Sequence, residues 1–306
     1  MKAILFAGQG SQQEKMGEDF YLSDSFAKDY YDKLDEDLKN IILESDMETI
    51  SKTENTQPAM IAYQTMISEM FKEDGIVFDY TAGLSIGEYA ALAHSEIITS
   101  EEAIEIAKIR GKLMAEVGAE INSGMIAVLG MDADVLEKYC QEISDGESRV
   151  EISNLNCPGQ IVVSGDIEAL NRLKISIEDQ ARRLVELNTS GPFHTTYMIP
   201  VEEELSKLFD KYEFKNENVE IPYNFIGRPR EDDEDIKEIM AKQVSHTVRF
   251  QECIEFLIER GVDTFVEVGF GGVLRGFIRK IDRKANVYVI DSIENYECFV
   301  KEVKND

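Results

Sequence analysis

Short apolar segments alternate with longer amphipathic ones along most of this sequence, and that alternation limits the possible folds more than any other feature. AILFA (3–7) has the length of a buried strand and leads into a glycine-rich turn. Residues 57–75 carry apolar side chains at helical spacing and end in glycine. The alternation continues through 76–118 and returns in VDTFVEVG (262–269) and NVYVID (286–291). Strands interleaved with helices indicate a mainly parallel sheet that is covered on both faces.

The middle of the chain follows a different order. Its segments predict strand, helix, strand, strand, helix and strand in turn, over 125–131, 133–143, 149–156, 159–165, 167–180 and 182–188. This is the order of a ferredoxin-like domain. We therefore predict an α/β fold class, with a large α/β-hydrolase-like domain (1–121 and 190–306) and an inserted small ferredoxin-like domain (122–189). A cleft between two such domains is a typical place for a small-molecule site.

Composition excludes several classes of function. The formal charge of −28 over 306 residues argues against a nucleic-acid partner. The longest apolar runs are too short to cross a membrane, and the N-terminus is typical of a first strand rather than a signal peptide. The four cysteines and three histidines are scattered, so we expect no disulfide framework and no metal site. Free cysteines favour the reducing cytoplasm as the location.

Ser85 lies between Gly83 and Gly87 where a predicted strand (76–85) becomes a predicted helix (86–95). A G-x-S-x-G turn in that context exposes the serine hydroxyl and aims the following helix at it, which is typical of a catalytic nucleophile. The backbone N–H of Ile86 is then a candidate oxyanion donor. The alternative is an ordinary glycine-rich loop, because so short a pattern also occurs by chance.

A nucleophilic serine needs a base, and His194 is the best candidate because it follows the small domain directly. His94 lies close after the elbow on the predicted helix and is expected to point elsewhere, and a capping or surface role is the better explanation for His246. A structural role remains the alternative for His194. The loop GQGSQ (8–12) has two glycines that free backbone N–H groups to face a site. It fails as a dinucleotide-binding motif because Gln13 stands where the third glycine belongs, and a plain tight turn is the alternative.

Taken together, these motifs resemble the malonyl-CoA:acyl carrier protein transacylase family of type II fatty acid synthesis. The landmarks appear in family order over almost the whole chain: GQGSQ (8–12), GLSIGEYAAL (83–92), RGKLM (110–114), NLNCPGQIVVSG (154–165), GPFH (191–194), Asn224, KQV (242–244) and FVEVG (265–269).

The resemblance assigns roles to individual residues. It implies that Ser85 is the acylated nucleophile, that His194 is its base, and that the N–H groups of Gln9 and Ile86 form the oxyanion hole. It also implies that a backbone carbonyl near Gln243, instead of a carboxylate, orients the histidine.

Arg110 carries the inference about the substrate. From its position alone it is a solvated helix residue, but the family's carboxylate-binding arginine matches it. A guanidinium in a dry pocket pairs with the free carboxylate of a malonyl group and is left unpaired by an acetyl group. The resemblance makes Met114, Met125 and Phe193 the pocket wall, although by themselves they would be core residues.

The implied reaction is a ping-pong transfer of malonyl from malonyl-CoA to the phosphopantetheine thiol of acyl carrier protein, with no metal or redox cofactor. Three alternatives to this function remain: a serine thioesterase or hydrolase, a non-catalytic scaffold, and a free-standing acyltransferase of a polyketide synthase.

Four positions depart from the family pattern. Leu84 replaces a usual histidine, Ala7 a usual proline, and Phe270 and Gly272 replace common Pro and Lys. None of these changes removes a reacting group, but the loop after FVEVG is expected to differ in shape.

An acidic carrier protein needs a local basic patch on so acidic a chain. Two clusters are candidates for docking the carrier or coenzyme A: Arg182 and Arg183, and a set in RGFIRKIDRK comprising Arg275, Arg279, Lys280 and Arg283. Helical spacing predicts that Arg275, Arg279 and Arg283 share one face. Solubilising charge paired with nearby carboxylates is the alternative.

Overall fold

The computed structural model describes residues 1–146, 148–189 and 191–305. The chain divides into two compact units, one comprising Met1–Gly111, Tyr212–Pro222 and Phe256–Asp306, the other Lys112–Lys211 and Tyr223–Glu255. The expected boundaries of an inserted domain stay a prediction, and two of them, residues 190 and 306, lie outside the described residues.

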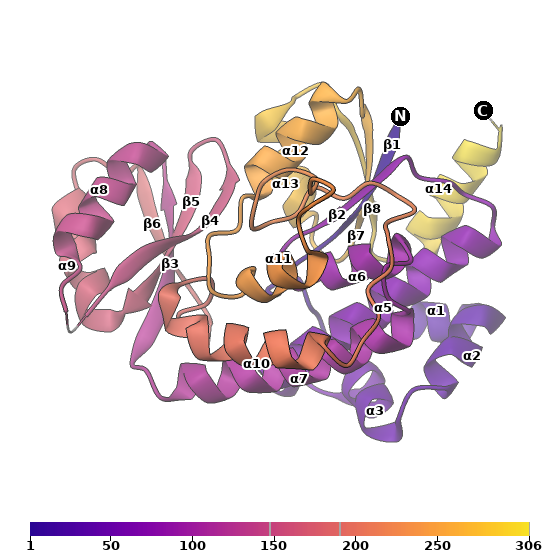
Figure 1. Ribbon diagram of the computed structural model, residues 1–306. Helices are drawn as coiled ribbons and strands as arrows, with labels where there is room; N and C mark the ends of the chain where they lie inside the picture. Colours follow the sequence, from indigo (N-terminus) through magenta and orange to yellow (C-terminus); the bar gives the residue numbers. More distant parts are fainter. Residues whose placement is uncertain (147, 190, 306) are drawn as a thin grey trace. The chain divides into compact units, whose positions relative to one another are not determined.

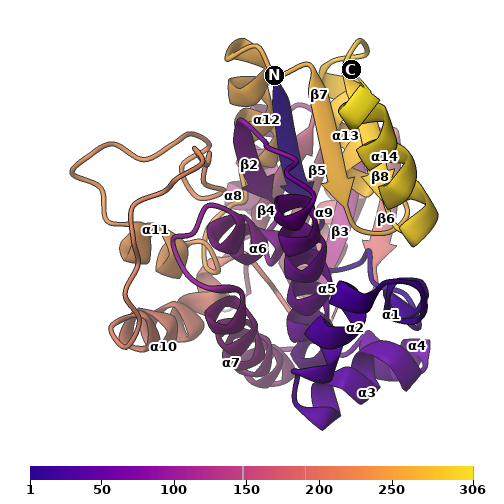
Figure 2. The ribbon, with the colours of Figure 1, turned by 90° about the vertical axis from the view of Figure 1, so that its right-hand side faces the viewer.

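The first unit is built on a parallel sheet, as the alternation of segments predicts. Its strands are β1 (Lys2–Phe6), β2 (Tyr80–Gly83), β7 (Thr264–Val268) and β8 (Asn286–Ile290). They lie in the order β2-β1-β7-β8, and every pair is parallel. Figure 2 shows the four strands side by side. β2 is shorter than the predicted strand 76–85, because Val77 is 74% exposed and the backbone leaves the extended region at Ser85.

Helices cover the parallel sheet on both faces. Besides α12 (Phe250–Glu259), which enters it from the second unit, the first unit holds or shares α1 (Glu18–Ser23), α2 (Ser25–Asp32), α3 (Glu36–Glu44), α4 (Met47–Ile50), α5 (Thr53–Glu73), α6 (Gly87–His94), α7 (Ser100–Ala119), α13 (Val273–Ile281) and α14 (Ile293–Asn305). The chain steps from β1 to β2 in one direction and from β7 to β8 in the other. Right-handed crossovers therefore place α5 and α13 on opposite faces, as Figure 1 shows.

Aromatic side chains join α5 to α14 on one face of this sheet. The ring centroid of Phe71 on α5 lies 4.8 Å from that of Tyr296 and 5.7 Å from that of Phe299, both on α14. All three side chains are buried. Large apolar rings packed at such distances account for much of the burial that holds the C-terminal helix in place.

The second unit contains an antiparallel sheet with the predicted ferredoxin-like order. Its strands are β3 (Ser123–Leu129), β4 (Val150–Cys157), β5 (Gln160–Asp166) and β6 (Arg183–Leu187), arranged β4-β5-β3-β6. Two helices, α8 (Ala133–Ile143) and α9 (Ile167–Ile177), complete the β-α-β-β-α-β order. Asp132 caps α8 by accepting the N–H of Asp134.

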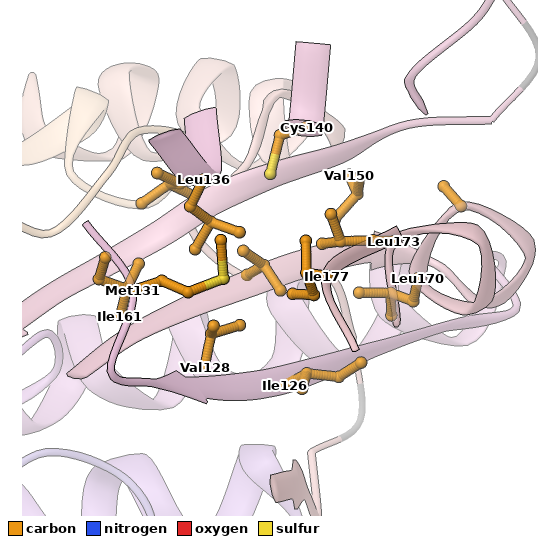
Figure 3. Close-up of a cluster of buried hydrophobic side chains, with 13 residues drawn as sticks. Ile126, Val128, Met131, Leu136, Cys140, Val150, Ile161, Leu170, Leu173 and Ile177 are labelled. Atoms are coloured by element: carbon orange, nitrogen blue, oxygen red, sulfur yellow. The ribbon is translucent and has the colours of Figure 1, made fainter. Parts of the chain in front are cut away.

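A hydrophobic cluster fills the space between that sheet and its two helices. Figure 3 shows Ile126 and Val128 of β3 facing Leu136 of α8 and Leu170 of α9, among other buried side chains. Alternate residues of the strands enter the cluster, so the opposite residues of each strand point to the other face of the sheet. That other face is where β4 carries Glu151, between Val150 and Ile152 of the core.

The remaining elements of the second unit are η1 (Thr196–Met198), α10 (Ile199–Phe209), α11 (Ile236–Lys242) and α12 (Phe250–Glu259), the last of which continues into the first unit. Among the described residues, no helix is long and apolar enough to span a membrane.

One expectation about α13 is wrong. The helix ends at Ile281, and Asp282 is extended (φ −133°, ψ 113°), so Arg283 lies beyond the last turn. Arg275 and Arg279 are both on the helix, but Arg283 does not continue their face. Lys280 and Arg279 lie in the last helical turn, where positive charge interacts favourably with the helix dipole.

The fit of α6 against β1 leads to the first prediction. A Cβ at Gly87 would lie 2.2 Å from the backbone oxygen of Phe6, whereas a Cβ at Gly276 in α13 would meet no atom within 4 Å. Gly87→Ala should lower the free energy of unfolding by about 2 kcal/mol or more, because backbone blocks the methyl group. Gly276→Ala should leave it unchanged or raise it by about 0.5–1 kcal/mol. Urea unfolding of both variants measures the difference, and equal stabilities would contradict this account of the packing.

Candidate active site

Ser85 sits on a strained turn between β2 and α6, as the G-x-S-x-G pattern predicts. Its φ is +53°, in the left-handed region that non-glycine residues rarely adopt. The N–H of Leu84 donates to Phe6 O (2.9 Å), and the N–H of Gly87 donates back to Leu84 O (3.0 Å). A Cβ at Gly83 would lie 2.1 Å from the carbonyl carbon of Gly87, so only glycine allows this close a turn. The geometry is that of a nucleophile elbow.

Two backbone N–H groups of the first unit are available as oxyanion donors. Within the described part of the chain, neither Gln9 nor Ile86 uses its N–H in a hydrogen bond with another protein group. Ile86 lies at the N-cap position of α6, where backbone N–H groups have no partner inside the helix. Their roles as oxyanion donors stay a prediction.

Arg110 is fully buried and lies against Ser85. Its Nη2 donates to Ser85 Oγ at 3.4 Å, and its Nη1 donates to Gln57 Oε1 at 2.8 Å. Its guanidinium carbon is 5.5 Å from the ring centroid of Tyr89. The expectation of a solvated arginine, which position alone favours, is therefore wrong.

The surroundings of Arg110 set its electrostatics. Burial lowers the pKa of Arg110, an effect opposed by the neighbouring Tyr89 and Glu88, while burial raises the pKa of Tyr89 to about 12. A guanidinium remains charged under such conditions because its ordinary pKa is so high. The first unit thus holds a positive group, removed from water, beside a candidate nucleophile.

Sequence reasoning missed the side chains that hold this arginine. Gln57 Nε2 also donates to Gln9 Oε1 (3.5 Å), and Gln9 Nε2 donates to Thr53 Oγ1 (3.0 Å). Arg110 is followed by Gly111, whose added Cβ would lie 2.9 Å from Thr53 O. That glycine lets α7 approach the start of α5 closely. The pair Arg110-Gly111 on a predicted helix was the sequence signal from which this close packing could have been inferred.

His194, in the second unit, is also held in a left-handed conformation, with φ +59°. Its Nδ1 lies 2.8 Å from the backbone oxygen of Gln243, and its N–H donates to Val244 O at 3.1 Å. A carbonyl only accepts hydrogen bonds, so Nδ1 carries the proton and Nε2 keeps its lone pair. The predicted contact with a backbone carbonyl at Gln243 is present, and the tautomer that it fixes suits a base.

The other two histidines have structural contacts. His94 is buried, with Nδ1 2.8 Å from Ser68 Oγ, and burial lowers its pKa to about 3. His246 is exposed and bonds through Nδ1 to Lys242 O (3.0 Å) at the end of α11. The exposed position of His246 at the end of α11 agrees with the capping or surface role expected for it, and His94 points to Ser68, which gives it a structural contact.

The remaining predicted residues differ in exposure. Met114, Met125 and Phe193 belong to the second unit and are buried, which fits a pocket wall and a core equally. Arg182, Arg183, Arg279, Lys280 and Arg283 are exposed, whereas Arg275 is half-buried. Arg182 and Arg183 belong to a different unit from the α13 cluster.

Local contacts explain three of the four departures from the family pattern. The N–H of Ala7 donates to Val268 O (3.2 Å), a bond that proline could not make. Phe270 stacks on Tyr63 with centroids 4.8 Å apart. Gly272 has φ +64° and begins α13, so lysine would be strained there. Nothing in the structure explains Leu84.

The described residues contain no group of three or more His, Cys, Asp or Glu side chains that could hold a metal ion.

Comparison with known proteins identifies the family. Residues 4–297 match the acyl transferase domain family. The chain is 36% identical to the malonyl CoA-acyl carrier protein transacylase of Bacillus subtilis, over 99% of this chain and 98% of that protein. The chain belongs to the malonyl-CoA:acyl carrier protein transacylase family.

Solved structures of the family agree. The transacylase from Clostridium perfringens matches with a TM-score of 0.94 at 33% identity, covering 99% of this chain and 97% of that one. A malonyl-transacylase in complex with a type II PKS acyl-carrier protein matches with a TM-score of 0.93 at 29% identity, covering 98% and 99%. As a family member the chain is an acyltransferase, and its α/β fold is the family's fold.

Proposed function

We propose that this protein transfers a malonyl group from malonyl-CoA to the phosphopantetheine thiol of acyl carrier protein, through an acyl-enzyme on Ser85. The observation that carries the proposal is the buried guanidinium of Arg110, with Nη2 3.4 Å from Ser85 Oγ. A malonyl group has a free carboxylate close to its thioester carbonyl. It therefore fits a site with a cation adjacent to the nucleophile.

In the first half-reaction Ser85 Oγ attacks the thioester carbonyl carbon. His194 Nε2 takes the hydroxyl proton as the new C–O bond forms, and the negative oxygen is stabilised by the N–H groups of Gln9 and Ile86. The C–S bond then breaks, and His194 returns the proton to the departing thiolate of coenzyme A.

The second half-reaction reverses these steps with a different thiol. His194 takes the proton of the pantetheine thiol of the carrier, the sulfur attacks the ester carbonyl, and Ser85 leaves with the proton from His194. The mechanism requires that His194 reach Ser85 in the working enzyme. No step needs a metal or a redox cofactor.

The partners and setting follow from the same proposal. The solved complex of a related transacylase with its carrier protein supports an acyl carrier protein as partner here. The curated relatives named malonyl CoA-acyl carrier protein transacylase favour fatty acid synthesis over the polyketide alternative. We place the protein in the cytoplasm, where malonyl-CoA and a carrier would be available.

The nucleophile is tested by mass. Incubation with malonyl-CoA should add one malonyl group to the parent protein, located by peptide mapping at Ser85, and Ser85→Ala should show no adduct. The control is Ser176→Ala, which removes an exposed hydroxyl that donates to Arg172 O on α9. This variant should be acylated normally. An adduct of equal amount on the Ser85 variant would reject the mechanism. Rapid release of free malonate by the parent without carrier would instead favour the hydrolase alternative.

The selectivity prediction concerns Arg110. Arg110→Ala should lower kcat/KM for malonyl transfer by about 100-fold or more, because the substrate carboxylate loses its buried partner. Acetyl transfer should fall much less or rise. Lys112→Ala, on the same helix but with a side chain that is 72% exposed, is the control and should change neither rate. Equal losses with both substrates would mean that Arg110 only supports the fold.

The exposed basic residues support carrier docking. Among the described residues, neither Arg279 nor Arg283 lies within 4.0 Å of a carboxylate, so the alternative of locally paired charge does not apply to them. Unpaired surface cations on a chain of net charge −28 create a local field that attracts an acidic partner.

Charge reversal tests this surface. The double variant Arg279→Glu, Arg283→Glu should raise the KM for carrier protein by about 10-fold while malonyl-CoA still acylates Ser85 at the parent rate. The KM of the parent for the carrier should also rise with salt. Lys28→Glu with Lys138→Glu, at two exposed lysines of α2 and α8, makes the same change in net charge and serves as the control. A carrier KM that responds to neither salt nor reversal would place docking elsewhere.

A further inference from the structure

The backbone of His194 is strained and needs outside support. A left-handed residue that is not glycine costs of order 1 kcal/mol, so it persists only where neighbouring contacts fix it. The bonds to Gln243 O and Val244 O fix the histidine itself on one side. The chain that follows it is fixed by other contacts, which the catalytic mechanism does not use.

Glu151 holds the residue two positions after the histidine. Its Oε2 accepts the N–H of Thr196 at 2.9 Å, and its Oε1 accepts the hydroxyl of the same threonine. Thr195, between Thr196 and His194, donates its own hydroxyl to Pro192 O at 2.6 Å. One carboxylate therefore accepts hydrogen bonds from both the N–H and the hydroxyl of Thr196, just after the strained backbone of His194.

The carboxylate of Glu151 is itself fixed by the small sheet. Glu151 lies on β4 and pairs with Ser164 of β5, while its neighbours Val150 and Ile152 are buried in the hydrophobic cluster. The alternation of a strand thus directs Glu151 to the face opposite that core. Glu151 is the second residue of β4, and its backbone is paired with β5, so its carboxylate is anchored more rigidly than one on a loop.

A second carboxylate supports the same segment. Tyr197 donates its hydroxyl to Asp166 Oδ2, which also accepts the N–H of Arg149 at 2.9 Å. The guanidinium carbon of Arg149 lies 4.4 Å from the ring centroid of Tyr197. These contacts act one residue further from His194 than Thr196 does, so Glu151 is the closer support.

We propose that Glu151 is a positioning residue for His194: it fixes the chain after the histidine so that Nε2 stays where proton transfer needs it. The inference rests on the proposed function, in which His194 is the base. Proton transfer needs heavy atoms about 2.6–3.2 Å apart, and a displacement of about 1 Å costs up to about 100-fold in rate. In the proposed mechanism, Glu151 contacts neither the reacting groups nor the substrate.

The test compares three variants by kcat and KM. Glu151→Ala should lower kcat about 10- to 100-fold with the KM for malonyl-CoA unchanged, because binding residues are untouched. Glu151→Gln should retain kcat within about 3-fold, since an amide oxygen still accepts the Thr196 N–H and the amide N–H₂ can donate to the threonine hydroxyl. Thr196→Val, which loses only the hydroxyl, should lower kcat about 3- to 10-fold. If the negative charge of Glu151 were the active feature, and not its hydrogen bonds, Glu151→Gln would lose kcat as Glu151→Ala does.

Controls separate this inference from the proposed function. Glu186→Ala removes an exposed carboxylate from β6 of the same sheet and should leave kcat unchanged. His194→Ala should abolish acylation of Ser85; if it stays fully active, the proposed base is wrong. If His194→Ala is inactive while Glu151→Ala and Thr196→Val keep the parent kcat, only the positioning role is overturned. If Glu151→Ala fails to fold, Thr196→Val decides, and parent kcat in that variant rejects the proposal.

Discussion

The approach of α6 to β1 and β2 is the contact on which the candidate site depends. A Cβ at Gly87 would lie only 2.2 Å from the backbone oxygen of Phe6. A Cβ at Gly83 would lie 2.1 Å from the carbonyl carbon of Gly87. Because no side chain separates the helix from the strands, the chain must turn within Leu84, Ser85 and Ile86. That short turn forces Ser85 into the left-handed region and places the N–H of Ile86 at the start of the helix. The two glycines therefore determine the position of the nucleophile before any polar contact does.

Both candidate catalytic residues have a positive φ, and they are held by different means. Ser85 is fixed by steric closeness between backbones, whereas His194 is fixed by hydrogen bonds to carboxylates and carbonyls on either side of it. On the carbonyl side, Ser245 donates its hydroxyl to Glu202 of α10, two residues after Gln243. On the other side, Glu151 accepts from Thr196. Strain that is supported in this way fixes a side chain in one orientation, which is what a base needs.

Much of the fold was predictable because the segments have clear periods. The strand and helix order of both sheets follows from alternating apolar runs, and the ends of α8 agree with the expected 133–143. The end of α13 was not predictable in the same way. Asp282 interrupts a run of basic residues at helical spacing, and only the backbone shows that Arg283 lies outside the helix. The ends of strands and helices are set by local competition between backbone conformations, which the spacing of side chains in the sequence does not reveal.

The candidate site was predictable where a motif fixes a backbone shape, and not where a side chain acts through another. The G-x-S-x-G pattern specifies its own turn, so Ser85 could be identified from sequence. Gln57 and Glu151 belong to no motif. Gln57 lies 53 positions before Arg110, to which it bonds, and Glu151 lies 45 positions before Thr196. Each is an ordinary polar residue on a regular helix or strand, and its importance arises only when the tertiary fold brings it to a strained or buried partner. Polar support of this kind depends on burial and geometry together, since a carboxylate in water competes poorly for two hydrogen bonds from one threonine, whereas one fixed on a paired strand is already oriented to accept both.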